Sequence, residues 1–295
     1  MPTTIQMMTQ MIRMNPTSKF SGAVVLSMFA FALGCPPIAV AAPQSDMPSA
    51  QAEAMTPEPV RQDLSYPLPA GMAIEVDNPY GSVYVRFGGY EHQFDMHTTL
   101  QKPVGAARIA FDPAQKEGRF LVAPRLPDGV ALAEGQRLDL VLYVPQHHAL
   151  SVRTDSGPIE SRGVKSDLVF RSRSGDIMLR GTEGVIDVET GDGKIEAIIT
   201  ETAPPGSRQR LVSRTGSVLL STTDKLDAEV RMSTSQTFAT DFSLTVEYRD
   251  GQEPDKYARA VVGAPKSGAN RALVAIESLV GEVRLQRRAV FVDPE

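Results

Sequence analysis

The chain has 295 residues, a formal net charge of −5, 42% hydrophobic residues, few aromatic residues and no tryptophan. A mildly acidic chain without a basic cluster makes nucleic acid a poor partner, and four histidines with one cysteine leave little for a zinc site or a disulfide framework. The 23 glycines and 22 prolines are typical of a fold with many short strands and turns.

Residues 1–41 have the features of a secretory signal peptide. Arg13 and Lys19 precede an apolar run at residues 21–34, and the segment Ala39-Val-Ala41 offers a small-x-small cleavage site. We therefore expect an exported protein, located in the periplasm or at the cell surface.

This end of the chain leaves alternatives open. Pro36 and Pro37 interrupt the apolar run before it reaches the roughly 20 residues of a membrane span, which argues against an uncleaved anchor. Cys35 follows Ala-Leu-Gly, a blurred version of the lipoprotein signal, so membrane association is expected only if this cysteine is lipidated or the signal stays uncleaved. Translation could start at Met1 or at Met14.

Residues 42–66 are rich in Pro, Ala, Gln and Ser and lack apolar periodicity, which predicts a flexible linker. A single folded domain is predicted at residues 67–292. Its first part contains segments with strand patterns separated by turn residues. We expect them to form an antiparallel β-meander that covers the first coil of a repeat, since an open end would expose unpaired backbone groups. These segments are Gln93–Leu100, Ala107–Phe111, Arg119–Ala123 and Arg137–Val144.

One short pattern then recurs three times between Leu150 and Ala197. Each copy has apolar residues in alternation, which predicts strands with one buried face. A small hydroxyl residue stands three positions before a glycine, and the glycines are Gly157, Gly175 and Gly193, 18 residues apart each time. A fixed period predicts stacked, equivalent units.

Three further copies of this pattern lie around Gly81, Gly216 and Gly281, and the copy at Gly216 lacks one apolar residue. Each copy predicts a strand, a corner and a second strand. We expect the hydroxyl to bond the backbone at the corner and the glycine to supply a positive φ there. The sequence thus predicts an all-β fold, a parallel β-solenoid with an antiparallel β-meander near the N-terminus.

The last third of the chain departs from the 18-residue spacing. Thr200–Arg210 predicts a loop insertion, and Leu226–Met232 and Phe242–Tyr248 predict strands without a glycine corner. Arg249–Lys266 is predicted to be a polar connection.

The four histidines are interpreted as surface residues of strands and turns: His92, His97, His147 and His148. Gly191-Asp-Gly-Lys-Ile195 resembles part of a calcium nonapeptide, but the signature does not recur every nine residues, so a calcium roll is not expected. An acyltransferase hexapeptide helix is excluded because aliphatic residues do not recur every six positions. We expect no metal, cofactor-binding or catalytic residues.

Outward carboxylates offer an enzymatic alternative. Glu160 and Glu196 occupy equivalent positions two coils apart, about 10 Å by strand spacing, near the upper end for an inverting acid and base pair. In other outward rows carboxylates alternate with cations: Arg153 and Arg171 share a row with Glu189, and Lys194 shares one with Asp176. These mixed rows, and the absence of a tryptophan platform for a sugar ring, favour a solvated charge ladder.

Three sequence features together resemble a known family: the segment Glu75–Val85, the strand Leu140–Pro145 and the repeated Ser/Thr-x-Ser-Gly-x-Ile. They resemble the DUF4097 group of bacterial adhesin-like domains over residues 70–285. The resemblance implies β-solenoid-like repeats in exported or membrane-tethered proteins, and it implies no catalytic residue.

The leading hypothesis is a non-enzymatic envelope or surface protein that acts as a binding or scaffold module, with an envelope protein or polysaccharide as its partner. One alternative is a carbohydrate-active β-helix enzyme that uses the outward carboxylates. Another is an envelope-stress accessory protein that signals through a partner.

Cleavage after Ala41 gives a testable expectation. It removes two positive charges and no acidic residue, so the net charge changes from −5 to −7 and the mature chain begins at Ala42. Intact-mass measurement and N-terminal sequencing of the exported protein check this. A chain that begins at a lipid-modified Cys35, or one that keeps residues 1–41, would contradict it.

Overall fold

The computed structural model describes residues 59–200, 204–264 and 270–288. All of them belong to one compact unit, Ala54–Glu295. The described residues form 21 strands in two large sheets and no helix, so none of them forms a helix that could cross a membrane. The predicted signal peptide and residues 42–58 of the predicted linker lie outside the described residues.

The two sheets are mostly parallel and face each other. Sheet A runs in the order β1 (Val60–Pro67), β4 (Gln93–Gln101), β7 (Arg137–Val144), β3 (Val83–Phe87), β9 (Ile159–Arg162), β11 (Ile177–Arg180), β13 (Ile195–Ile199), β15 (Val218–Thr222), β21 (Val283–Arg287) and β17 (Phe238–Thr240). Sheet B runs in the order β18 (Thr245–Tyr248), β19 (Lys256–Val262), β16 (Ala228–Thr234), β20 (Ala272–Ser278), β14 (Arg208–Ser213), β12 (Ile186–Thr190), β10 (Leu168–Ser172), β8 (Leu150–Thr154), β2 (Ala73–Asn78), β6 (Arg119–Val122) and β5 (Ala114–Lys116).

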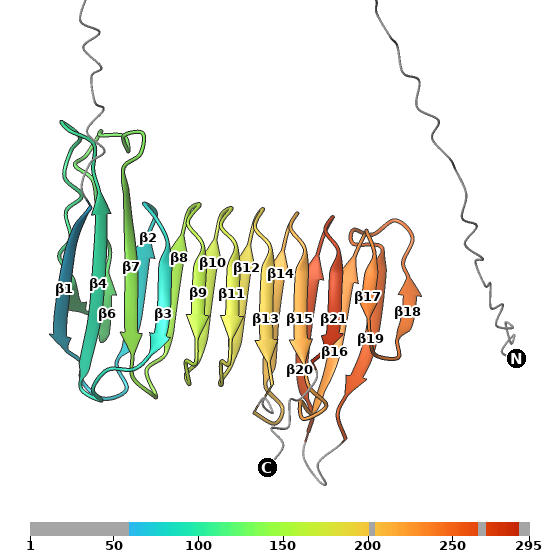
Figure 1. Cartoon of the computed structure of the whole chain (residues 1–295). Helices are drawn as coiled ribbons and strands as arrows, with labels where there is room; N and C mark the ends of the chain where they lie inside the picture. The colour runs from blue at the N-terminus through green and yellow to red at the C-terminus, as the bar shows by residue number, and fades with distance from the viewer. Residues whose placement is uncertain (1–58, 201–203, 265–269, 289–295) are drawn as a thin grey trace, which may run out of the picture. The chain divides into compact units, whose positions relative to one another are not determined.

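The 18-residue repeat corresponds to one coil of a solenoid. Each coil places one strand in sheet B and the next in sheet A, as in β8–β9, β10–β11 and β12–β13 (Figure 1). Leu168 pairs in parallel with Leu150 on one side and with Ile186 on the other, each 18 residues away. The predicted all-β, parallel fold is therefore confirmed.

The first and last copies of the pattern are inserted one coil inside the ends of the stack. β2–β3 lies between the coil β6–β7 and the coil β8–β9, and β20–β21 lies between β14–β15 and β16–β17. The terminal coil of the stack is therefore β6–β7 at one end and β16–β17 at the other. Antiparallel strands extend the sheets beyond these coils: β1, β4 and β5 at the first end, β18 and β19 at the second.

The N-terminal block differs from a simple meander. β7 pairs antiparallel with β4 but parallel with β3, and β6 pairs parallel with β2, so these two strands form a coil of the solenoid. The predicted strand Ala107–Phe111 is a connection with only an isolated bridge, Ala110 to Arg125. These pairings join segments distant in sequence, which local alternation cannot specify.

Two segments predicted as irregular are strands. Residues 60–66 of the predicted linker belong to β1 (Val60–Pro67). Most side chains of β1 are exposed, and its backbone pairing with β4 joins it to the sheet. The predicted connection Arg249–Lys266 contains β19, whose inward residues are mostly small: Ala258, Ala260 and Val262.

The six pattern glycines are required by close approach between coils, and the expectation of a positive φ is wrong. None of them has a left-handed φ. A Cβ on Gly175 would lie 2.2 Å from the carbonyl oxygen of Gly157, far inside van der Waals contact. A Cβ built on four of the other pattern glycines would lie similarly close to the carbonyl oxygen of the glycine in the adjacent coil. The distances are 1.9 Å from Gly157 to Gly81, 2.2 Å from Gly193 to Gly175, 2.1 Å from Gly216 to Gly193 and 2.3 Å from Gly281 to Gly216.

The hydroxyl three positions earlier bonds the same glycines, as predicted. Thr190 Oγ1 accepts the N–H of Gly193 at 3.2 Å and donates to the carbonyl of Gly175 in the preceding coil at 3.0 Å. Other hydroxyls donate to the carbonyl of a glycine in the adjacent coil in the same way, each at 2.7 Å: Ser213 to Gly193, Ser278 to Gly216 and Thr234 to Gly281.

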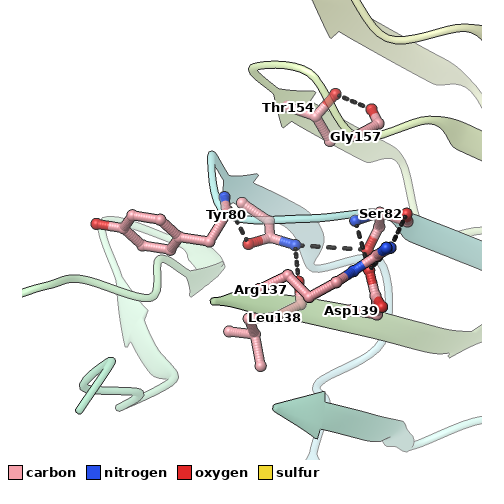
Figure 2. Close-up of polar contacts among 8 residues, drawn as sticks. Tyr80, Ser82, Arg137, Leu138, Asp139, Thr154 and Gly157 are labelled. Atoms are coloured by element: carbon pink, nitrogen blue, oxygen red, sulfur yellow. Dashed lines mark hydrogen bonds and ion pairs between the residues drawn. The ribbon is translucent and has the colours of Figure 1, made fainter. Parts of the chain in front are cut away.

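This row of hydrogen bonds begins with an amide instead of a hydroxyl. The side chain of Asn78 donates from Nδ2 to the carbonyl of Leu138 at 2.8 Å, and its Oδ1 accepts the N–H of Tyr80 (Figure 2). Asp139 accepts the N–H of Ser82 and a hydrogen bond from Arg137, and the Arg137–Asp139 bond is the main reason that the pKa of Arg137 is raised. The end coil is thereby joined to the first pattern copy.

The core between the sheets is mostly apolar, and one coil carries a buried amide where its first apolar residue is missing. Gln209 stands there, 2% exposed, and its side chain accepts the N–H of Ile186 and donates to the carbonyl of Gly184 at 3.2 Å. A buried amide is tolerated because both of its polar ends are bonded.

Gly175→Ala tests close approach. The new Cβ forces the coils apart, and we expect a loss of about 3 kcal/mol or more in the free energy of unfolding. Gly129→Ala is the control, because nothing lies within 4 Å there and φ is +77°; its cost should be about 1–2 kcal/mol. Urea unfolding measures both, and equal losses would contradict the close-approach explanation.

Thr190→Val tests the hydroxyl row. Valine has nearly the same shape but leaves the Gly193 N–H and the Gly175 carbonyl without their partner, so we expect a loss of about 2–4 kcal/mol in unfolding free energy. Thr190→Ser retains the hydroxyl and should cost less than about 1.5 kcal/mol. A valine variant as stable as the serine variant would show that the hydrogen bonds do not matter.

Candidate functional site

A charged groove runs along the outer face of sheet B where its strands turn towards sheet A. Its volume is about 710 Å³, and it spans β2, β8, β10, β12 and the corner after β14. A volume in this range is typical of ligand sites, although this groove is polar and open.

One wall of the groove is a row of outward side chains on adjacent strands. Asp77, Arg153, Arg171 and Glu189 follow one another in register, four positions before the corner glycine in each coil. Neighbouring strands lie about 4.8 Å apart, so this row presents one charge per coil along the solenoid axis.

The other wall is the corner itself. Asp155, Arg173, Gly191 and Arg214 occupy the second position before the glycine in successive coils. Backbone bonds hold this row, because the amides of Gly191 and Asp192 donate to the carbonyls of Ser172 and Arg173 at 3.1 Å each. A Cβ on Gly191 would lie 2.3 Å from the carbonyl oxygen of Arg173, so close stacking leaves a gap in this wall between two arginines.

Several charges of the groove are joined in exposed ion pairs. Arg173 bonds Asp155 at 3.1 Å, Arg171 bonds Asp187 at 2.5 Å, and Arg210 bonds Glu189 at 2.7 Å. Exposed pairs of this kind contribute about 0–1 kcal/mol each, so a ligand can exchange with them at little cost.

Arg210 shows how the local charges act. Partial burial alone lowers its pKa, but hydrogen bonds and charge attraction from Glu189 and Asp187 outweigh burial and raise the pKa above its ordinary value. Arg153 and Arg214 form no ion pair with any of the described residues. Two guanidinium groups are thus available for a ligand.

The carboxylate pair of the enzymatic alternative lies on the opposite sheet. Glu160 and Glu196 are both in register with Met178, so they lie two strand spacings apart as expected. Met178 fills the position between them, where an inverting enzyme would place a sugar and a water. Glu160 bonds Arg86 at 3.1 Å and also contacts Arg162, and Glu196 bonds Lys194 at 3.3 Å.

The histidines do not converge. His97 contacts Asp63 on the outer face of sheet A and packs edge-on against Tyr143, while His92 is exposed in the turn before β4. His148 was expected at the surface but is only 2% exposed, and its Nδ1 donates to the carbonyl of Met72 at 2.9 Å, which is a structural role. Within residues 59–200, 204–264 and 270–288, no group of three metal-binding side chains occurs.

Sequence reasoning identified the charged rows but missed the hollow between them. The charged side chains of these rows point outward, as the alternation of apolar and polar residues along each strand predicts. The groove arises at the corner, and the signal for it was the additional glycine Gly191 in the position where the neighbouring coils carry Arg173 and Arg214.

Comparison with profiles of known protein families gives no match, and comparison with functionally curated sequences gives none either. Among solved structures, the chain is similar to a putative cell adhesion protein from Clostridium sporogenes, with 11% identity, a TM-score of 0.47, and 78% of this chain and 100% of the other covered. Putative adhesins from Bacteroides fragilis (10% identity, TM-score 0.35) and Parabacteroides merdae (7%, 0.26) cover 78% of this chain and 97% and 96% of their own.

Proposed function

We propose that the protein is a non-enzymatic binding module of the bacterial envelope whose sheet-B groove holds an extended, charged partner. The observation that carries this proposal is the groove itself, which spans five coils and offers charges of both signs at a constant spacing. A linear partner, either an envelope polypeptide or a charged polysaccharide, can contact all five coils at once.

The arrangement of charges in the groove supports a role in ligand binding better than a role in stabilising sheet B. Arg153 and Arg171 are direct cross-strand neighbours of like charge, an arrangement that does not stabilise a sheet. Arg171 is compensated by Asp187. Arg153 is in register with Asp77 on its other side but forms no ion pair with a described residue. An anionic group of a ligand placed between the two guanidinium groups would relieve their repulsion and accept hydrogen bonds from both.

The envelope location is a proposal that rests on residues 1–41 and on the resemblance to the DUF4097 adhesin-like group. The non-enzymatic role is supported by the Glu160 and Glu196 pair, which is separated by Met178 and joined to cations. A periplasmic or surface location would place the groove where envelope polymers are abundant.

Site-specific photo-crosslinking tests the groove. A photoreactive residue at Ser151, which lines the groove, should capture a partner from intact envelopes, whereas the same residue at Ser221 should not. Ser221 is the matched control because it is also half-buried and faces outward, but on sheet A.

Charge reversal gives the second arm of this test. Arg153→Glu with Arg171→Glu should reduce capture at Ser151 at least tenfold. The double variant loses the Arg171–Asp187 pair and places carboxylates opposite Asp77 and Glu189, so its free energy of unfolding is measured beside capture and should fall by no more than about 1–2 kcal/mol. Arg284→Glu on sheet A is the control and should have no effect. Equal capture at Ser151 and Ser221, or full capture by the double variant, would contradict the proposal.

A further inference from the structure

A second cavity forms where sheet A projects beyond sheet B at the N-terminal end of the stack. β1, β4 and β7 contain 8, 9 and 8 residues, while the facing strands β6 and β5 contain 4 and 3. The long strands extend past the neighbouring coils (Figure 1). Their inner face is therefore not covered by a strand over its whole length.

The cavity has a volume of about 340 Å³ and mostly apolar walls. Val60, Leu100 and Leu138 form one in-register row across β1, β4 and β7. Ile109 and Phe111, from the connection after β4, line the same cavity. This volume lies at the lower end of the range for small-molecule sites, about 300–1,000 Å³.

The connection that lines the cavity is held in place by hydrogen bonds. Gln136, 4% exposed, donates from its side chain to the carbonyl of Ala107 at 2.7 Å. Ala110 and Arg125 exchange two backbone bonds of 2.6 and 2.8 Å, and the ammonium group of Lys102 donates to the carbonyl of Ala106 at 2.7 Å. The cavity is thus preformed, which lowers the entropic cost of binding.

The polar groups of the cavity select for an anion. Lys102 and Arg108 line it, and no carboxylate does. Arg108 has no ion pair with a described residue. The hydroxyl of Thr98 is also in the lining; the residue is 4% exposed, and no hydrogen bond joins this hydroxyl to the described part of the chain. A head group seated in the cavity can accept a hydrogen bond from this hydroxyl.

We propose that this cavity binds a small amphiphile with one apolar tail and an anionic head, of the medium-chain fatty-acid class. The tail packs against the row of Val60, Leu100 and Leu138 and against Phe111. The head accepts hydrogen bonds from Lys102, Arg108 and Thr98. This site is separate from the groove of sheet B, and neither depends on the other.

Titration calorimetry of the intact protein with decanoate tests the proposal. We expect one decanoate per chain, bound up to about tenfold more tightly than octanoate because two methylene groups are added to the buried tail. Decyltrimethylammonium, with a tail of the same length and a cationic head, should not bind. The double variant Lys102→Glu and Arg108→Glu should reverse this preference.

Lys116→Glu is the matched control. Lys116 is an exposed cation in β5 at the same end of the stack, and it does not line the cavity, so the Lys116→Glu variant should bind decanoate as the unaltered protein does. Binding that is absent, independent of tail length, or unchanged in the double variant overturns the proposal. If only a chain shortened to begin at residue 59 bound decanoate, the segment before Val60 would be the natural occupant, and the proposal would again be wrong.

Discussion

Contact between the backbones of successive coils at the glycine column governs this structure. Where the Cα of Gly175 meets the carbonyl of Gly157, there is no room for a side chain, and the neighbouring hydroxyl of Thr190 bonds the Gly175 carbonyl from the next coil. Together these contacts fix the register of each coil against the last. A slip of one residue would place a Cβ against a carbonyl and turn every inward side chain outward.

The same close stacking shapes the groove. Corners that approach within backbone contact keep their outward residues in straight rows, which is why Arg153 and Arg171 face each other and why Gly191 leaves a gap beside Arg173. A binding surface with a constant spacing of about 4.8 Å is therefore a direct product of the fold. The side chains of the row Arg153, Arg171 and Glu189 point away from the core, so their charges can change while the buried face of each coil stays the same.

The sequence predicts the stacked coils because their determinants are local: alternation, a hydroxyl and a glycine at fixed spacing. It fails where pairing is long-range. β1 and β19 carry few large apolar residues, and the insertion of β2–β3 and β20–β21 one coil inside the ends depends on contacts across most of the chain. The prediction of a positive φ at the pattern glycines failed for a related reason. A glycine required by contact with another coil looks the same in the sequence as a glycine required by a positive φ.

The two candidate sites follow from two different departures from the regular repeat. At the groove, the regular stack is intact and only the side chains differ, so recognition there follows the period of the coils and suits a long partner. At the N-terminal end, the repeat stops and sheet A projects beyond sheet B, so a partly open cavity forms that suits a small ligand. The terminal coil β6–β7 is joined to the first pattern copy by the hydrogen bond from Asn78 to the carbonyl of Leu138. A ligand that stabilises this terminal coil would therefore also stabilise the end of the stack against local unfolding.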